Sequence, residues 1–133
     1  MRPMVRLKGT GVLMADDDPE SLEVLQEIVV YEGATVRTAI DATEVLEILQ
    51  RWTPDVLLID IGMPVVNGFE LLKRIRGTPG GVSIPAVAIS GYAYERDKQL
   101  CIEAGFARHM SKPFDVDELI QLIASLVPHP HDA

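Results

Sequence analysis

The stretch that most constrains the fold is 56–64, in which the apolar run Val56-Leu57-Leu58-Ile59 leads directly into Asp60. An unbroken apolar run that contains β-branched residues is typical of a parallel strand buried on both faces. Gly62 and Pro64 then end the run. We therefore expect Asp60 at the carboxyl end of a central strand, which is where open α/β sheets place their ligand sites.

Strand-like and helix-like patterns alternate along the rest of the chain. The strands are expected at 12–15, 34–39, 56–60, 86–89 and 107–110, and the helices are expected to begin near residues 19, 41, 67, 95 and 115. The second helix is expected to include Trp52 and to end at Pro54. Such alternation predicts a parallel sheet covered by helices on both faces. The polar pattern of 34–39 suits an edge strand, so the predicted fold is a flavodoxin-like (βα)5 three-layer α/β sandwich with strand order 2-1-3-4-5.

Length and composition limit the class of protein. The 133 residues suffice for one domain, expected over 11–127, with tails at 1–10 and 128–133. A net charge of −8 argues against direct binding to nucleic acid. No apolar run approaches the ~18 residues of a membrane span, and the first residues do not form a signal peptide. The lone Cys101 excludes an internal disulfide, so a cytoplasmic location without membrane contact is expected.

Three carboxylates are expected to meet at one edge of this sheet. Asp16 and Asp17 follow the first strand, and Asp60 ends the third. Carboxylates that share a crevice repel each other unless a cation neutralises them, and hard oxygen ligands suit Mg²⁺. Ser90 and Lys112 follow the fourth and fifth strands, and together with Mg²⁺ they would bind a phosphoryl group. A carboxylate nucleophile there would form an aspartyl-phosphate.

Four motifs carry a resemblance to a known family over about 11–127. They are Val12-Leu13-Met14-Ala15-Asp16-Asp17-Asp18-Pro19, Leu57-Leu58-Ile59-Asp60-Ile61-Gly62-Met63-Pro64 with Asn67-Gly68, Ser90-Gly91, and Lys112-Pro113-Phe114. Each alone is weakly specific, but all four in this order at strand ends are highly specific. The chain resembles the receiver domain of a bacterial two-component response regulator.

The resemblance implies that Asp60 accepts a phosphoryl group from a phosphohistidine on a sensor histidine kinase or a histidine phosphotransfer protein. It implies that Asp17, Asp60 and the Gly62 carbonyl ligate Mg²⁺ (or Mn²⁺), with Asp16 acting largely through water. The domain would then be a signalling phospho-acceptor in a phosphorelay rather than an enzyme that turns over a substrate.

The resemblance also assigns roles around the acceptor. Lys112 would contact a phosphoryl oxygen, with a cis bond to Pro113, and Ser90 would swing inward to hydrogen-bond another oxygen. His109 stands where the family often has Tyr or Phe, so it is a candidate switch residue with Ser90. Gly62 and Tyr92 occupy positions that tune the lifetime of the phosphate in similar domains.

Two surfaces are expected to contact other proteins. The resemblance implies that the fourth helix, fifth strand and fifth helix report to a downstream protein. The first helix, from Pro19, would dock the phosphohistidine partner. The resemblance also leaves open a stand-alone receiver or a piece of a hybrid histidine kinase.

Two other functions are alternatives to a phospho-acceptor: an enzyme that uses the same chemistry, and an interaction module on the same fold. An aspartate-nucleophile phosphohydrolase usually carries a second Asp two residues after the nucleophile, where this chain has Gly62. A pseudo-receiver would act only as an interaction module, and it would be expected to lack Asp17, Asp60 or Lys112. Asp18, by contrast, is interpreted as a helix cap before Pro19 rather than as a metal ligand.

Overall fold

A five-stranded parallel sheet forms the centre of the molecule. The computed structural model describes residues 6–91 and 95–127. The sheet has the order β2-β1-β3-β4-β5, and every neighbouring pair is parallel. Its strands are β1 (Gly11–Ala15), β2 (Thr35–Ala39), β3 (Val56–Asp60), β4 (Ala86–Ser90) and β5 (Arg108–Ser111). This confirms the predicted flavodoxin-like fold and strand order 2-1-3-4-5.

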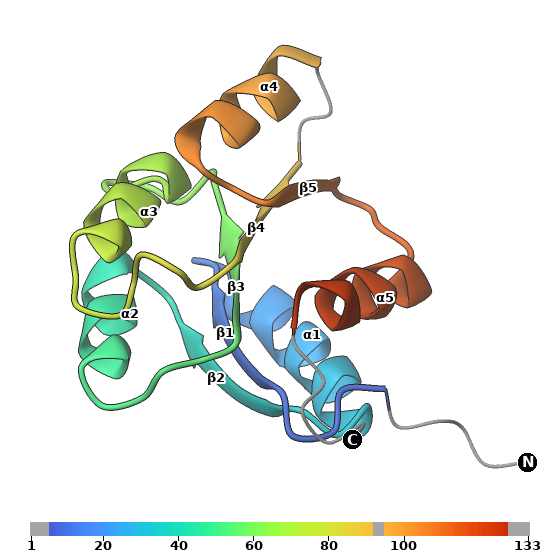
Figure 1. Cartoon of the computed structure of the whole chain (residues 1–133). Coiled ribbons are helices and arrows are strands. Elements are labelled where there is room, and N and C mark those ends of the chain that lie inside the picture. The colour runs from blue at the N-terminus through green and yellow to red at the C-terminus, as the bar shows by residue number, and fades with distance from the viewer. Residues whose placement is uncertain (1–5, 92–94, 128–133) are drawn as a thin grey trace, which may run out of the picture.

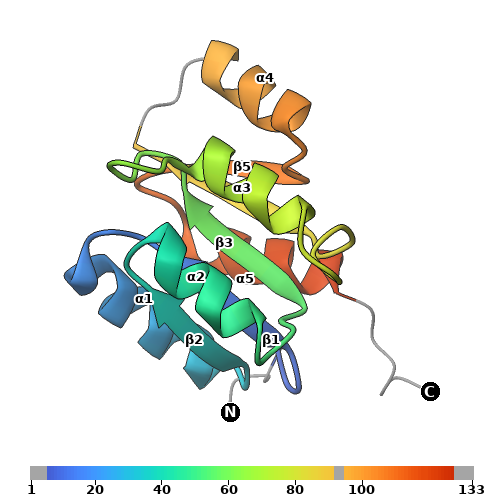
Figure 2. The same ribbon diagram turned by 90° about the vertical axis from the view of Figure 1, so that its left-hand side faces the viewer.

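Five helices cover the two faces of the sheet. They are α1 (Pro19–Tyr31), α2 (Ala42–Leu49), α3 (Gly68–Arg76), α4 (Glu95–Ala104) and α5 (Val116–Leu126). Helices α1 and α5 lie on one face, and α2 and α3 lie on the other, with α4 beside α3 near β5 (Figures 1 and 2). None of the helices within 6–91 and 95–127 combines the length and apolarity that crossing a bilayer requires.

The sheet separates two hydrophobic cores. Leu57 and Ile59 of β3 face the core under α2, α3 and α4, together with the fully buried Cys101. Leu58 faces the core under α1 and α5, where it packs with Met14. Because successive side chains of a strand point to opposite faces, the unbroken apolar run of β3 supplies both cores. Asp60 follows as the first polar residue, at the carboxyl edge.

Polar side chains fix where the helices begin. The carboxylates of Asp18, Asp41 and Asp115 and the amide of Asn67 accept hydrogen bonds from backbone N–H groups in the first turns of α1, α2, α5 and α3. These N–H groups have no partner within the helix, so each cap stabilises the start of its helix. The interpretation of Asp18 as a cap before Pro19 is confirmed.

Helix α2 is shorter than the sequence pattern predicts. It ends at Leu49, so the expected continuation through Trp52 to Pro54 is wrong. A residue before proline is disfavoured in helical geometry, which keeps Thr53 out of the helix. The indole of Trp52 instead lies against Gly11, where an added Cβ would approach Trp52 Cζ2 to 2.8 Å.

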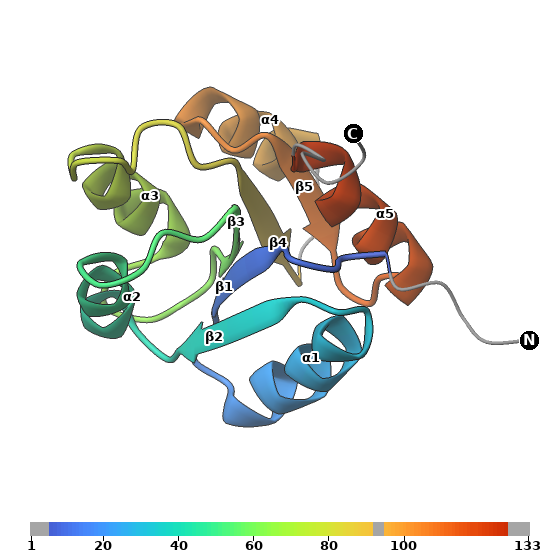
Figure 3. The ribbon, with the colours of Figure 1, turned by 60° about the horizontal axis from the view of Figure 1, so that its bottom comes forward.

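The segment 6–10 before β1 packs on the domain. Leu7 is fully buried in the core under α1 and α5, and its N–H donates to the Glu32 carbonyl at 2.8 Å. Figure 3 shows this segment running from β1 toward α5. The proposed domain limits of 11–127 remain a prediction.

We expect Leu7→Ala to lower the free energy of unfolding by about 3 kcal/mol, because it removes a buried side chain and leaves a cavity. Urea denaturation followed by circular dichroism measures this change. Val82→Ala is the control, since Val82 is 70% exposed and its truncation should change stability by less than about 0.5 kcal/mol. An equal effect of both substitutions would contradict the packing role of Leu7.

Candidate functional site

Three aspartates meet at the carboxyl edge of the sheet. Asp16 and Asp17 directly follow β1, and Asp60 is the last residue of β3, which pairs with β1. One carboxylate oxygen from each of the three residues lies within 4.8 Å of the others. Asp16 is buried, Asp60 is half-buried and Asp17 is exposed. The structure therefore brings together the three carboxylates that the sequence placed at one crevice.

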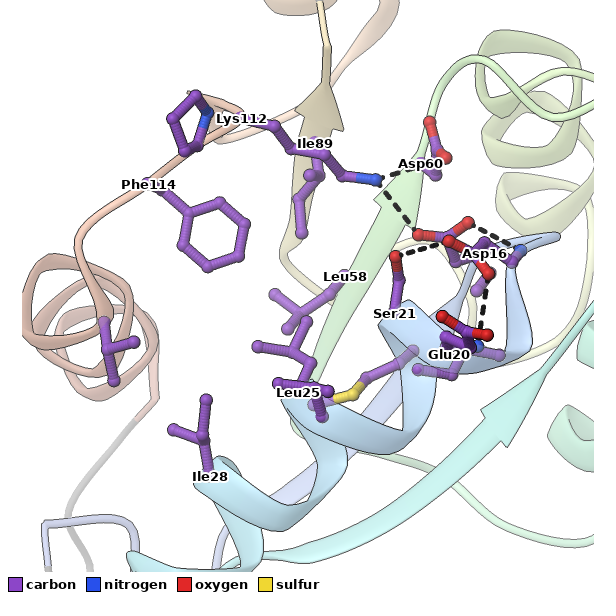
Figure 4. Close-up of a pocket in the computed structure, with 17 residues that line it drawn as sticks. Asp16, Glu20, Ser21, Leu25, Ile28, Leu58, Asp60, Ile89, Lys112 and Phe114 are labelled. Atoms are coloured by element: carbon purple, nitrogen blue, oxygen red, sulfur yellow. Dashed lines mark hydrogen bonds and ion pairs between the residues drawn. The ribbon is translucent and has the colours of Figure 1, made fainter.

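Lys112 supplies a positive charge to this cluster. Its Nζ lies 3.2 Å from Asp16 Oδ2 and 3.7 Å from Asp60 Oδ2 (Figure 4). The backbone N–H of Lys112 donates to the Ser90 carbonyl at 2.7 Å, which continues the β4–β5 pairing beyond Ser111. The Lys112–Pro113 peptide bond is cis, as expected. Ser90 is buried at the end of β4, on the same edge as the carboxylates.

The electrostatic environment shifts the pKa values of the two central groups. Burial raises the pKa of Asp60 above its ordinary value, and the negative charge of Asp16 adds to this rise. The Gly62 N–H, which donates to Asp60 Oδ1 at 2.8 Å, and the charge of Lys112 oppose it. Burial lowers the pKa of Lys112, but the nearby charges of Asp16, Asp60 and Asp18 outweigh burial and raise it. Lys112 is thus a cation held in place by carboxylates.

The loop after Asp60 folds tightly beside the Asp60 carboxylate. An added Cβ at Gly68 would lie 2.6 Å from the Ile61 Cα, so only glycine allows this approach of α3 to β3. Gly62 lies exposed two residues past Asp60, and Val65 adopts a positive φ of 66°. The loop therefore presents the backbone of Gly62 to the Asp60 carboxylate.

Two other predicted residues lie outside this cluster. His109 is half-buried in β5, where it pairs with Ala88 of β4. Its place in the strand agrees with a partly buried position, and its role as a switch stays a prediction. Tyr92 lies outside the described residues.

A cavity of about 490 Å³ adjoins the carboxylates, between α1 and the segment 112–116. Figure 4 shows Lys112, Asp16 and Asp60 at one end of it. Its apolar lining includes Leu25, Ile28, Leu58, Ile89 and Phe114. Leu25 and Ile28 of α1 are half-buried and pack against the core under α1 and α5. No sequence signal distinguishes them from core residues, because the separation of α1 and α5 depends on tertiary packing.

The donor set of the cluster fits Mg²⁺. Carboxylate oxygens are hard ligands, and two or three of them leave room for the water and phosphate oxygens that Mg²⁺ usually keeps. No His or Cys belongs to the cluster, so its composition does not favour a softer metal. A divalent cation would also relieve the repulsion among Asp16, Asp17 and Asp60.

The comparisons with known proteins agree with this geometry. A model of the response regulator receiver domain matches residues 12–124. The chain belongs to this family. This receiver domain is 40% identical over 120 residues to an uncharacterized 14.6 kDa protein of Leptolyngbya boryana, with 90% of this chain and 92% of the relative covered.

The receiver domain is also similar to part of a much longer protein. It is 33% identical over 113 residues to the sensor histidine kinase RcsC of Salmonella typhi, covering 85% of this chain but only 12% of the kinase. Among solved structures, the receiver domain of the sensor histidine kinase PA1611 from Pseudomonas aeruginosa PAO1 has a TM-score of 0.81 at 25% identity. That match covers 89% of this chain and 97% of the other, whose active-site cleft coordinates a magnesium ion.

We expect Asp60→Asn to stabilise the metal-free receiver domain near neutral pH. Because folding raises the pKa of Asp60, ionisation of this carboxyl disfavours the folded state. This cost appears as pH rises past the ordinary pKa of 3.8 and is complete above the raised folded-state pKa. The gain from the substitution should therefore be larger near pH 7 than in mild acid. Urea denaturation in excess EDTA at several pH values measures this gain in the free energy of unfolding. A gain that falls as pH rises would contradict a raised pKa of Asp60 in the folded protein.

Proposed function

We propose that this receiver domain accepts a phosphoryl group on Asp60 from a phosphohistidine of a sensor histidine kinase or a histidine phosphotransfer protein, in the cytoplasm. The observation that carries the proposal is the position of Lys112 Nζ, 3.2 Å from Asp16 and 3.7 Å from Asp60, inside a cluster of three carboxylates. An ammonium group and several carboxylates at one strand edge suit a site for a transferred phosphoryl group. Family membership supports the same function.

The chemical step is a displacement at phosphorus. A carboxylate oxygen of Asp60 attacks the phosphorus atom, a P–O bond forms, and the P–N bond to the partner's imidazole breaks. The leaving imidazole nitrogen takes a proton from solvent. Lys112 neutralises one phosphoryl oxygen, and the Ser90 hydroxyl donates a hydrogen bond to another.

Asp17 and Asp60, together with the Gly62 carbonyl, would hold Mg²⁺ (or Mn²⁺), with Asp16 acting largely through water. When bound, the ion neutralises the carboxylates and the charge on the phosphoryl oxygens. The roles of this chain's residues follow from their positions. Buried Asp16 anchors Lys112, while exposed Asp17 remains accessible to an incoming ion.

The product of the step is a signal rather than a released chemical. Gly62 provides no acidic side chain to speed turnover, so we propose a phospho-acceptor and not a phosphohydrolase. Gly62 and Tyr92 would then set how long the phosphate lasts. Movement of Ser90 and His109 would change the face formed by α4, β5 and α5, and thereby the binding of a downstream protein.

The direct test is the intact mass of the protein after incubation with Mg²⁺ and acetyl phosphate. We expect the wild type to gain one phosphoryl group and Asp60→Asn to gain none, because the nucleophilic oxygen is lost. Asp41→Asn is the matched control: Asp41 caps α2, asparagine also caps helices, and the variant should be phosphorylated like the wild type.

The other outcomes separate the rival functions. An adduct on Asp60→Asn would show that another residue is the acceptor. Continuous release of phosphate without an adduct would favour a phosphohydrolase or a very rapid self-dephosphorylation. Neither adduct nor release, even with a histidine kinase as donor, would favour a pseudo-receiver.

We expect removal of the divalent cation with EDTA to abolish the phosphoryl adduct. Asp17→Asn should weaken Mg²⁺ binding by at least about tenfold, because the site then loses one of its few carboxylates. Isothermal titration with Mg²⁺ measures the affinity, and Asp41→Asn again serves as the control. Unchanged affinity in Asp17→Asn would exclude Asp17 as a ligand.

A further inference from the structure

Arg6 connects two helices from a position outside the residues that the family model matches, 12–124. Its backbone N–H, Nε and Nη2 donate to the carboxylate of Glu32 at 3.2, 3.3 and 3.0 Å. Its Nη2 also lies 3.0 Å from Asp117 Oδ1. Glu32 caps the carboxyl end of α1, and Asp117 lies in the first turn of α5. One guanidinium group therefore joins the end of α1 to the start of α5.

The contact with Glu32 fixes the position of Arg6. Glu32 is buried, and it lies at the carboxyl end of α1, where the helix dipole disfavours a negative charge. A buried carboxylate in such a place requires a paired cation. The hydrogen bonds from Arg6 accordingly hold the pKa of Glu32 below its ordinary value. Burial of the neighbouring Leu7 restrains the same segment.

The contact with Asp117 is the more exposed one. The side chain of Asp117 is 72% exposed, compared with 9% for Glu32. Arg6 is thus anchored on α1, and from there it restrains the first turn of α5. The segment 113–116 connects this turn to Lys112, with φ of Pro113 fixed by its ring and Asp115 capping α5.

The same segment borders the cavity of about 490 Å³ and so lacks close packing on its α1 side. Phe114 and Val116 line this cavity, and Val116 is 40% exposed. Because the start of α5 has little apolar packing on the side of the cavity, the ion pair between Arg6 and Asp117 contributes a larger share of the interactions that hold it. Residues 113–116 are the chain path by which a displacement of this turn would reach Lys112, whose ammonium group contacts Asp16 and Asp60.

We propose that Arg6 is a positioning residue for Lys112, acting through Asp117 and the start of α5. The inference deepens the proposed phosphoryl acceptance at Asp60 and rests on it for its kinetic consequence. Loss of the Arg6 guanidinium would then alter the geometry of the acceptor site.

The test compares Asp117→Asn with Glu118→Gln. Both substitutions remove one negative charge from the first turn of α5, but Glu118 has no contact with Arg6. With acetyl phosphate and Mg²⁺, we expect Asp117→Asn to lower the maximal rate of adduct formation about two- to fivefold, the range of an exposed ion pair, with little change in the half-saturating donor concentration. Glu118→Gln should match the wild type. In the Arg6→Gln background, Asp117→Asn should cause no further decrease.

A second readout does not depend on phosphorylation. We expect the NMR signal of Lys112 Nζ in the unmodified protein to shift in Asp117→Asn and not in Glu118→Gln, and the amides of 114–118 to exchange faster. Equal Lys112 signals and equal rates in the two variants would overturn the inference. If the wild type takes no phosphoryl group, the proposed function fails, and the Lys112 signal alone decides whether Arg6 positions this side chain.

Discussion

The arrangement of the candidate site depends on an electrostatic balance at the carboxyl edge of the sheet. Three carboxylates lie within 4.8 Å of one another, and Lys112 is the cation that lies among them. Burial and the charge of Asp16 raise the pKa of Asp60, so the folded protein contains a group that would be more stable in water. Such a site is unfavourable for folding, and a divalent cation bound there would relieve the repulsion among the carboxylates.

The two apolar cores fix the strand ends independently of the site. The fold therefore remains stable although the charged carboxylates at the site are unfavourable for folding. The residues of β3 are fully buried up to Ile59, and the pairing of β3 with β1 and β4 sets where Asp60 emerges. Lys112 reaches the cluster from β5, the far strand of the sheet, and is held partly by its backbone bond to Ser90. The rigid sheet therefore brings together groups from distant parts of the sequence.

Helix α1 connects three features of the domain. Its start, capped by Asp18, lies beside the carboxylates, its middle lines the cavity, and its end carries Glu32, which binds Arg6. Through Arg6 the segment before β1 is thus joined to the end of α1 and to the first turn of α5. The first helix is thus both the expected docking surface for a phosphohistidine partner and part of the framework around the three carboxylates.

The sequence by itself determined the strand order, most element limits and the convergence of Asp16, Asp17, Asp60 and Lys112, because these follow from local apolar patterns and from the common direction of parallel strands. It did not determine the end of α2, where the contact of Trp52 with Gly11 overrides helix periodicity. Only the tertiary structure decided the cavity beside α1 and the bridge from Arg6 to Glu32 and Asp117. Both depend on the spacing of helices α1 and α5, which no local pattern encodes.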